Sequence, residues 1–161
     1  MKVETGRLYH IKDEFFDIVN DPMLMSNHER GKKRPTYFTI KDNDILWFIP
    51  LSSRIDKYKK IVDQKIEKQG SCHSILIRKV MNKDQAILLQ NAFPTLEKYI
   101  DHVHTINGRP ATIVDSLKEE ILSSFQFLLS LKIKGKNHFF ADIDRIKAMM
   151  LEELKESVVN W

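Results

Sequence analysis

The spacing of apolar and polar positions divides the chain into a strand-rich part followed by a helical part. Short segments rich in β-forming residues predict strands over 7–11, 36–41, 45–50, 73–80, 86–90 and 102–106. Apolar residues at helical spacing predict helices near 12–19, over 54–68, and in two segments from residue 115 onward. Because strands come mostly first and helices last, we expect an α+β fold with an antiparallel sheet.

Turn-forming residues separate these elements, and no Pro/Gly-rich linker or internal repeat divides the chain. The expected hairpin connections are Asp42-Asn43-Asp44, Asn82-Lys83-Asp84 and Asn107-Gly108. Asn20-Asp21-Pro22 is expected to end the first helix, and Gln69-Gly70 the second. Residues 1–161 are therefore predicted to form a single domain.

Polar residues stand where three of the helices are expected to begin. Ser53 precedes Asp56 by three residues, and Ser116 precedes Glu119 by three, which is the spacing of a capping box. Asp115 is the alternative cap for the second of these helices. Asp142 is placed to cap the last helix. The stripe by which the helix over 54–68 is expected to face the core consists of Ile55, Tyr58, Val62 and Ile66.

Composition narrows the class of protein only a little. The chain has 26 Lys and Arg against 22 Asp and Glu, and a net charge of +4 is weak evidence for a nucleic-acid partner. A single cysteine, Cys72, allows no intramolecular disulfide and favours a reducing cytoplasm. No segment is apolar enough for a signal peptide or a membrane span, so neither export nor membrane insertion is predicted.

The distribution of charge is more informative at residues 49–60, where a strand is expected to run into a basic helix. Ser52 and Ser53 provide two hydroxyls at the junction, and Arg54 and Lys57 follow them. A helix start presents free N–H groups and the positive end of the helix dipole, so it favours anions. Phosphate is therefore the expected ligand, which points to RNA or a nucleotide.

Two interpretations of this helix start remain open. Ser53, Lys57, Lys60 and Gln64 share a face away from the apolar stripe, and such a row is often only a solvated surface. Ser53 could likewise serve only to cap the helix. The row nevertheless begins at the helix end that favours anions.

A polar and irregular segment over 23–35 predicts a long loop, and loops of this length are usually functional or disordered. It ends in Arg30-Gly31-Lys32-Lys33-Arg34-Pro35. His28, in the same loop, is the only residue near this basic cluster suited to proton transfer at neutral pH. Its alternative interpretation is an exposed loop histidine.

Other candidate chemistry is weaker. The sequence has no HEXXH, P-loop, GxGxxG or GxSxG pattern, which leaves zinc proteases, P-loop NTPases and the common hydrolases without support. His102 and His104 are expected on the same face of a strand. They could be metal ligands, or they could be surface or groove residues. Lys132, Lys134 and Lys136 form a solvated turn or part of an RNA groove.

Five spaced segments of the chain carry a resemblance to a known family. The segments are Leu8-Tyr9-His10-Ile11, Arg34-Pro35-Thr36-Tyr37-Phe38, Trp47-Phe48-Ile49-Pro50-Leu51-Ser52-Ser53, Lys57-Tyr58-Lys59 and Gln90-Asn91-Ala92-Phe93-Pro94. Together they resemble the ToxN/AbiQ family of type III toxin–antitoxin toxins, and most closely its CptN-like branch. No single short segment decides the resemblance, but the element order agrees over nearly the whole chain.

The resemblance implies a strongly curved antiparallel sheet flanked by helices, similar to the MazF/Kid toxins. It implies a sequence-selective, metal-independent endoribonuclease without cofactors. The implied partner is a small repeated RNA antitoxin that folds as a pseudoknot, is cut from its precursor by the toxin, and assembles with it into a closed hetero-oligomer. Released toxin would cleave cellular or phage transcripts in the cytoplasm.

The resemblance also implies site residues. Ser52 and Ser53 match the family's Thr/Ser-Ser active-site pair. Tyr37 or its neighbours, and the basic residue that precedes Pro35, match the other side of that site. Relatives have a Lys two residues after the second Ser, where this chain has Ile55, so Arg54 or Lys57 is expected to supply that charge. Lys33 is also expected to stabilise charge on the phosphate. The predicted RNA-binding residues are His28, Arg30, Lys32, Arg34, Lys59, Lys60 and Arg78.

The expected chemistry is attack of the 2′-OH on the adjacent phosphate, giving a 2′,3′-cyclic phosphate. The sequence does not identify the general base, because an unperturbed Lys with a pKa of about 10.4 is charged near neutrality. Two other functions remain open: a non-catalytic RNA-binding module with the same basic groove, and a protein-interaction domain that meets an acidic partner.

Overall fold

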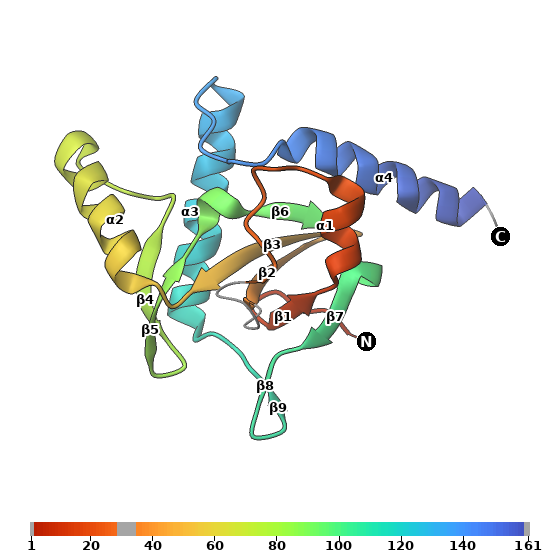
Figure 1. Ribbon diagram of the computed structural model, residues 1–161, viewed down its shortest axis with the longest axis horizontal. Helices are drawn as coiled ribbons and strands as arrows, with labels where there is room; N and C mark the ends of the chain where they lie inside the picture. Colours follow the sequence, from red (N-terminus) through yellow and green to blue (C-terminus); the bar gives the residue numbers. More distant parts are fainter. Residues whose placement is uncertain (1, 29–34, 160–161) are drawn as a thin grey trace.

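The computed structural model describes residues 2–28 and 35–159, and it confirms the α+β fold (Figure 1). The four α-helices are α1 (Asp13–Val19), α2 (Ile55–Gln69), α3 (Asp115–Ile133) and α4 (Ile143–Val159). The strands are β1 (Leu8–Ile11), β2 (Tyr37–Asp42), β3 (Ile45–Ser52), β4 (Leu76–Val80), β5 (Lys83–Ile87), β6 (Phe93–Thr95), β7 (Ile100–Val103), β8 (Thr105–Ile106) and β9 (Arg109–Pro110). Two short 3-10 helices cover Leu89–Asn91 and Glu97–Tyr99.

One antiparallel sheet organises the molecule, in the order β4-β5-β3-β2-β1-β7. The central strand β3 has two different neighbours along one of its edges: β6 pairs with Leu46–Phe48, and β5 pairs with Leu51 and Ser52. The change of partner falls at Pro50, which has no N–H to give to a ladder. In Figure 1, β4 and β5 are nearly vertical, whereas β2 and β3 run from one side of the picture to the other.

The core lies on both faces of β3, all eight residues of which are buried. Neighbouring side chains of a strand point to opposite faces. On one face of β3, Trp47 packs against Phe125 of α3, with ring centroids 5.2 Å apart. Phe48, on the other face, belongs to a cluster of aromatic rings that includes Phe93 of β6 and Phe15 of α1. A strand covered on both sides explains the continuous apolar run in this part of the sequence.

Helix α4 is attached to the end of α1 by polar contacts. The backbone N–H of Asp142 donates to Asp21 Oδ2 at 2.9 Å, and Arg145 donates to the carbonyl of Val19 at 3.1 Å. Asp142 Oδ1 accepts from the backbone N–H of Arg145, so the predicted cap of this helix is confirmed. None of the helices formed by the described residues is both long and apolar enough to cross a membrane.

Both predicted capping boxes are wrong. Pairing of Ser52 with Ala86 keeps the chain extended to the end of β3, so α2 begins only at Ile55 and no side chain caps it. Helix α3 begins at Asp115, so Ser116 lies inside the first turn rather than before it. Along α2, the predicted core stripe is confirmed at Tyr58, which is buried, and wrong at Ile66, which is 46% exposed.

The hairpin turns are confirmed at two positions and displaced at the third. Asn43 and Asn107 have positive φ between paired strands, as turn residues do. The turn between β4 and β5 is formed by Met81 and Asn82, with φ of 53° and 66°. Lys83 therefore lies at the start of β5, and its side chain belongs to the sheet rather than to the predicted turn.

Candidate functional site

The two serines of the strand–helix junction have different surroundings. Ser52 is buried, and its Oγ accepts a hydrogen bond from the backbone N–H of Arg54 at 3.2 Å. Ser53 is exposed, and its carbonyl accepts from the backbone N–H of Ile55 at 2.9 Å. Ser52 therefore holds the turn into α2, a common role of serine hydroxyls in turns. Ser53 presents its hydroxyl to solvent.

Ser53 lines a pocket of about 510 Å³ between the β4–β5 hairpin and the end of β1. Figure 1 shows that the tips of the β4–β5 and β8–β9 hairpins project from the same side of the molecule, next to this region. Polar side chains from β5 and from the segment before β8 line the pocket together with apolar ones, and most of the lining surface is apolar. The lining residues are His10, Pro35, Thr36, Leu51, Ser53, Val80, Met81, Lys83, Asp84, Gln85, His104 and Ile106.

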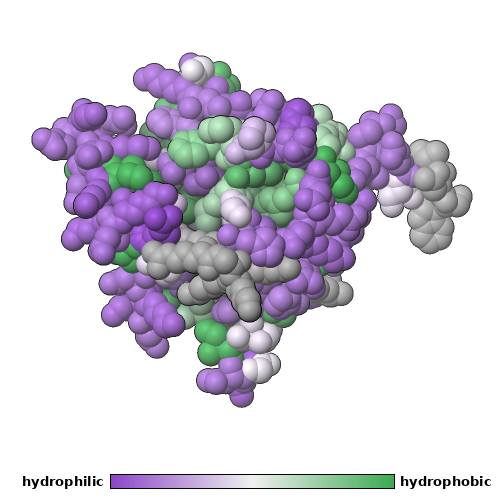
Figure 2. All heavy atoms as spheres, in the orientation of Figure 1, coloured by the Kyte–Doolittle hydropathy of each residue, from purple (hydrophilic) through white to green (hydrophobic). Residues whose placement is uncertain are grey.

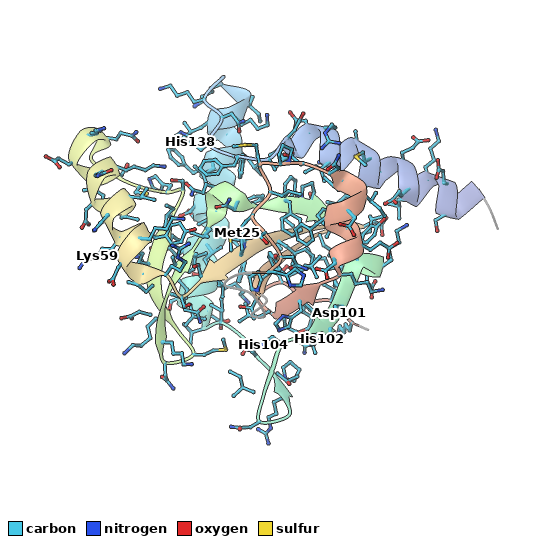
Figure 3. The ribbon with its side chains drawn as sticks, in the orientation of Figure 1. Met25, Lys59, Asp101, His102, His104 and His138 are labelled. Atoms are coloured by element: carbon cyan, nitrogen blue, oxygen red, sulfur yellow. The ribbon has the colours of Figure 1, made fainter. Side chains whose placement is uncertain are left out.

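Two histidines, His10 and His104, line the pocket, and a third, His102, packs against them. His10 Nε2 and His104 Nδ1 are 3.0 Å apart and share a hydrogen bond. The ring of His102 stacks on that of His10, with centroids 4.4 Å apart. Figure 3 shows His102 and His104 next to each other beside β1 and β7, with Asp101 close by. The sheet creates this cluster, because antiparallel pairing of β1 with β7 sets His10 directly opposite His102.

His104 is held firmly and is partly shielded from water. Its backbone N–H donates to the carbonyl of Leu8, and its carbonyl accepts from the N–H of Ala111, each at 2.8 Å. Burial lowers the pKa of His104 below the ordinary histidine value, and the neighbouring His102 lowers this pKa further. A histidine of this kind is neutral at neutral pH, so it can accept a proton.

The basic residues of α2 lie outside the pocket. Arg54, Lys57, Lys59 and Lys60 are all exposed, which agrees equally with a solvated surface and with an RNA-binding face. Figure 2 shows that the region over α2 is predominantly hydrophilic, and Figure 3 places Lys59 on its outer side. The ammonium group of Lys57 lies 5.1 Å from the ring centre of Tyr58. These charges are next to Ser53 along the chain and can meet a bound strand outside the pocket.

Tyr37 lies in the core and does not line the pocket. It is 1% exposed, and its hydroxyl donates to Asn27 Oδ1 at 2.9 Å. Asn27 in turn donates to the carbonyl of Ile11 at 2.8 Å. The residues of this stretch that reach the pocket are Pro35 and Thr36. The role predicted for Tyr37 in the site stays a prediction.

The remaining predicted residues of the loop divide into two groups. His28 pairs with Asp13 at the start of α1, with Nε2 and Oδ1 2.9 Å apart, and it is not among the pocket residues. Four basic residues predicted for the site lie outside the described residues, namely Arg30, Lys32, Lys33 and Arg34.

The solved structure of AbiQ has the same arrangement of elements. It is described as a lactococcal anti-phage endoribonuclease belonging to the type-III toxin–antitoxin system, and it aligns with a TM-score of 0.68 over 94% of this chain and 99% of its own. This chain has the AbiQ fold. The two sequences are only 16% identical, so the likeness establishes the architecture. No family model and no curated protein matches the sequence.

The AbiQ fold brings together residues that sequence reasoning missed. The predicted site did not include His10, Lys83 or Gln85, although the structure places all three in the Ser53 pocket. The one usable signal was the alternation of His102 and His104 on a strand, which was weighed only as a metal or groove feature. Among the described residues, no group of three or more His, Cys, Asp or Glu side chains is arranged to hold a metal ion.

Arg78 was predicted to bind RNA, and here it joins β4 to α3. Its Nε and Nη2 donate to the two carboxylate oxygens of Glu120 at 2.9 and 2.8 Å. This two-pronged geometry is the strongest arrangement for such a pair, but both side chains are about two-fifths exposed. Arg78 does not line the Ser53 pocket. Its role in RNA binding stays a prediction.

Glu120→Gln is expected to lower the free energy of unfolding by less than about 1 kcal/mol at pH 7, because water screens the pair. The hydrogen bond from Arg78 lowers the pKa of Glu120 in the folded protein. The contribution is therefore complete above the unfolded pKa and is lost as the pH falls through the folded pKa. Urea denaturation should show the difference from wild type shrinking in acid, and Glu119→Gln is the matched control. A difference that grows in acid would contradict this assignment.

A larger cleft of about 650 Å³ lies between the β2–β3 hairpin and α4. Its polar residues come from separate parts of the chain and include Lys2, Lys41 and Glu153. It shares no lining residue with the Ser53 pocket. We therefore take the smaller pocket, which contains the hydroxyl of Ser53 and the paired histidines, as the candidate site.

Proposed function

We propose that this protein is an endoribonuclease toxin of a type III toxin–antitoxin system. The observation that carries the proposal is the exposed residue Ser53 in a pocket that also contains two histidines and a lysine, in a chain with the AbiQ fold. Sequence segments that resemble the ToxN/AbiQ family, and its CptN-like branch in particular, support the same conclusion.

The reaction is attack of a 2′-OH on the adjacent phosphorus, leaving a 2′,3′-cyclic phosphate and a 5′-OH end. Such a reaction needs alignment of the attacking oxygen and stabilisation of the charge that develops on the phosphate. Ser53 bonds the 2′-OH or a phosphate oxygen. Lys83 supplies positive charge within the pocket, and Arg54 and Lys57 supply it at the adjoining start of α2. No step of this reaction needs a metal ion.

The inhibitor of the enzyme is a small repeated RNA that folds as a pseudoknot and closes with the toxin into a hetero-oligomer. Exposed basic residues on α2 suit an RNA partner, because phosphate contacts by Lys and Arg supply most of the affinity for nucleic acid. Transcripts of the cell or of a phage are the substrates once the inhibitor is lost. Short tandem DNA repeats followed by a terminator upstream of the coding region would encode this partner.

The mechanism is tested with one altered nucleotide. A cut site is first mapped in a long in-vitro transcript, and an oligonucleotide is then made with a single 2′-deoxy nucleotide on the 5′ side of that site. We expect no cleavage of this oligonucleotide, and full cleavage of the all-ribose control with and without EDTA. Cleavage of the deoxy oligonucleotide would exclude 2′-OH attack, and loss of cleavage in EDTA would exclude metal independence. Binding of the long transcript with no cut at any position would favour the non-catalytic RNA-binding module.

A further inference from the structure

The reaction proposed above needs a group that takes the proton of the 2′-OH at neutral pH, and the strand–helix junction offers none to the pocket, because its carboxylate, Asp56, is not a lining residue. Ser53, Arg54 and Lys57 cannot do this readily, because hydroxyl and cationic side chains are poor bases at pH 7. The pocket that Ser53 lines has two imidazoles in its wall, those of His10 and His104. Imidazole is the side chain best suited to proton transfer near neutrality.

We propose that Nε2 of His104 takes the proton from the attacking 2′-OH, and that His10 holds the His104 ring in position through its hydrogen bond to Nδ1. This inference rests on the proposed RNA-cleaving function and adds to it the residue that carries the proton. His104 acts as the general base, whereas His10 is a positioning residue.

The hydrogen bond between the two rings assigns different tasks to the nitrogens of His104. Its Nδ1 is 3.0 Å from Nε2 of His10 and is therefore already engaged. When Nδ1 carries the hydrogen and donates it to His10, Nε2 of His104 bears a lone pair. No hydrogen bond is made by His104 Nε2 within residues 2–28 and 35–159. It is the ring nitrogen left for a substrate in the pocket.

The surroundings of His104 keep it neutral and ready to accept a proton. Its pKa is lowered by burial and by His102. Two ionisable side chains of β5, Lys83 and Asp84, also line the pocket and carry opposite charges. The third ring, that of His10, belongs to β1 and bonds to His104 directly. Neutral imidazole is the form that a general base requires before the reaction begins.

Both rings are attached to β1, although His104 itself lies in the connection between β7 and β8. His10 lies in β1, directly opposite His102 of β7, and the two rings stack at 4.4 Å with an angle of 18° between them. The ring of His102 is within 3.2 Å of Asp101 Oδ2. The backbone N–H of His104 bonds to the carbonyl of Leu8 in β1. Both ends of the His10–His104 hydrogen bond are thus attached to one strand, which limits movement of the imidazole.

The reaction is a single displacement at phosphorus, accompanied by transfer of one proton to His104. The bond from the 2′-oxygen to phosphorus forms while the bond from phosphorus to the 5′-oxygen breaks, and His104 becomes an imidazolium. The departing 5′-oxygen takes a proton from water, and His104 gives its proton to the hydroxide that remains. The products are a 2′,3′-cyclic phosphate, a 5′-OH and the original neutral histidine.

The test compares two asparagine substitutions. In His104→Asn, the side-chain amide takes the place of Nδ1 and keeps a hydrogen-bonding group for His10, but nothing replaces Nε2. His138→Asn is the matched control, because His138 lies at the far end of α3 from His104 and outside the Ser53 pocket (Figure 3). Cleavage of the mapped all-ribose oligonucleotide is measured from pH 4.5 to 8.5, and binding is measured with the 2′-deoxy oligonucleotide.

We expect His104→Asn to lower kcat/KM by about 100-fold to 10,000-fold, the usual contribution of a general base, with binding of the deoxy oligonucleotide unchanged. The kcat/KM of wild type should fall in acid, with a midpoint below the ordinary histidine pKa of about 6.5. The pH profile of the variant should lack this acid limb. His138→Asn should behave as wild type. A His104→Asn variant that is folded and keeps cleavage within threefold of wild type overturns the assignment while the proposed function stands.

The positioning role of His10 gives a second measurement that holds even if His104→Asn does not fold. In His10→Gln, the amide lies near the place of Nε2 and can bond to His104, whereas His10→Ala has no such group. We expect the glutamine variant to recover most of the kcat that the alanine variant loses, with the acid limb displaced in the alanine variant. Equal kcat and pH profiles in both variants would overturn the positioning role. A wild-type protein that cuts no RNA would overturn the function and the base together.

Discussion

Replacement of Ser53 by alanine is expected to abolish RNA cleavage while folding and RNA binding persist. The hydroxyl is exposed in the pocket, and its removal leaves no buried group without a hydrogen-bond partner. The loss of kcat should be about 100-fold or more, which is typical when one transition-state hydrogen bond is removed. Gel-based cleavage of the all-ribose oligonucleotide measures the loss, and binding of the 2′-deoxy oligonucleotide shows that recognition remains.

The control is Ser123→Ala, at an exposed position of α3, which should cleave as wild type does. Ser52→Ala tests the structural role of the neighbouring serine. Loss of the hydrogen bond from the backbone N–H of Arg54 should lower the free energy of unfolding by about 1 kcal/mol. If Ser53→Ala cleaves at the wild-type rate, the pocket is not the site of the reaction. If it still arrests growth without cleaving RNA, the toxicity comes from binding alone.

Elements whose residues determine their own conformation were predicted well. Asn107-Gly108 formed the expected hairpin because both residues adopt positive φ, 53° and 79°, at little cost. Helix α2 ended at Gly70, which also has positive φ, and Asp142 capped α4 as expected. These signals lie within a few residues of the structure that they specify. They needed no knowledge of distant contacts.

The start of α2 could not be predicted in the same way. The spacing of Ser53 and Asp56 fits a capping box, but the end of β3 is held extended by its pairing with β5. That pairing joins Ser52 to Ala86, more than thirty residues away, so no local pattern reveals it. The consequence is functional, because it buries the hydroxyl of Ser52 and leaves that of Ser53 exposed.

The proton-transfer group was missed for a related reason. His10 and His102 are 92 residues apart in the sequence and become neighbours only through the pairing of β1 with β7. The sequence shows His102 and His104 on one face of a strand, but not what they face. Once the sheet is formed, Ser53 at the end of β3 and His104 after β7 line one pocket. The site is therefore a product of strand order, and the strength of the core below it determines how well it is held.

Phe93→Ala is expected to give the largest loss of stability of the substitutions considered, about 3–5 kcal/mol. Phe93 is 2% exposed. Its ring centre is 5.0 Å from that of Phe15, 5.4 Å from that of Tyr37, and 6.2 Å from that of Phe48. Removal of the ring leaves a cavity among three elements that cannot all move inward, so both the burial and the ring contacts are lost.

Urea denaturation followed by circular dichroism should show the midpoint falling by roughly 2 M, if the slope is near the usual value of about 2 kcal/mol per molar. Phe140→Ala is the matched control, because the side chain of Phe140 is 48% exposed, and its midpoint should change little. At low temperature without urea, folded Phe93→Ala should retain nearly the wild-type kcat, since Phe93 does not line the Ser53 pocket. A stable variant with low kcat would instead show that the aromatic cluster positions the reacting groups, and that β3 transmits a change in the core to Ser53.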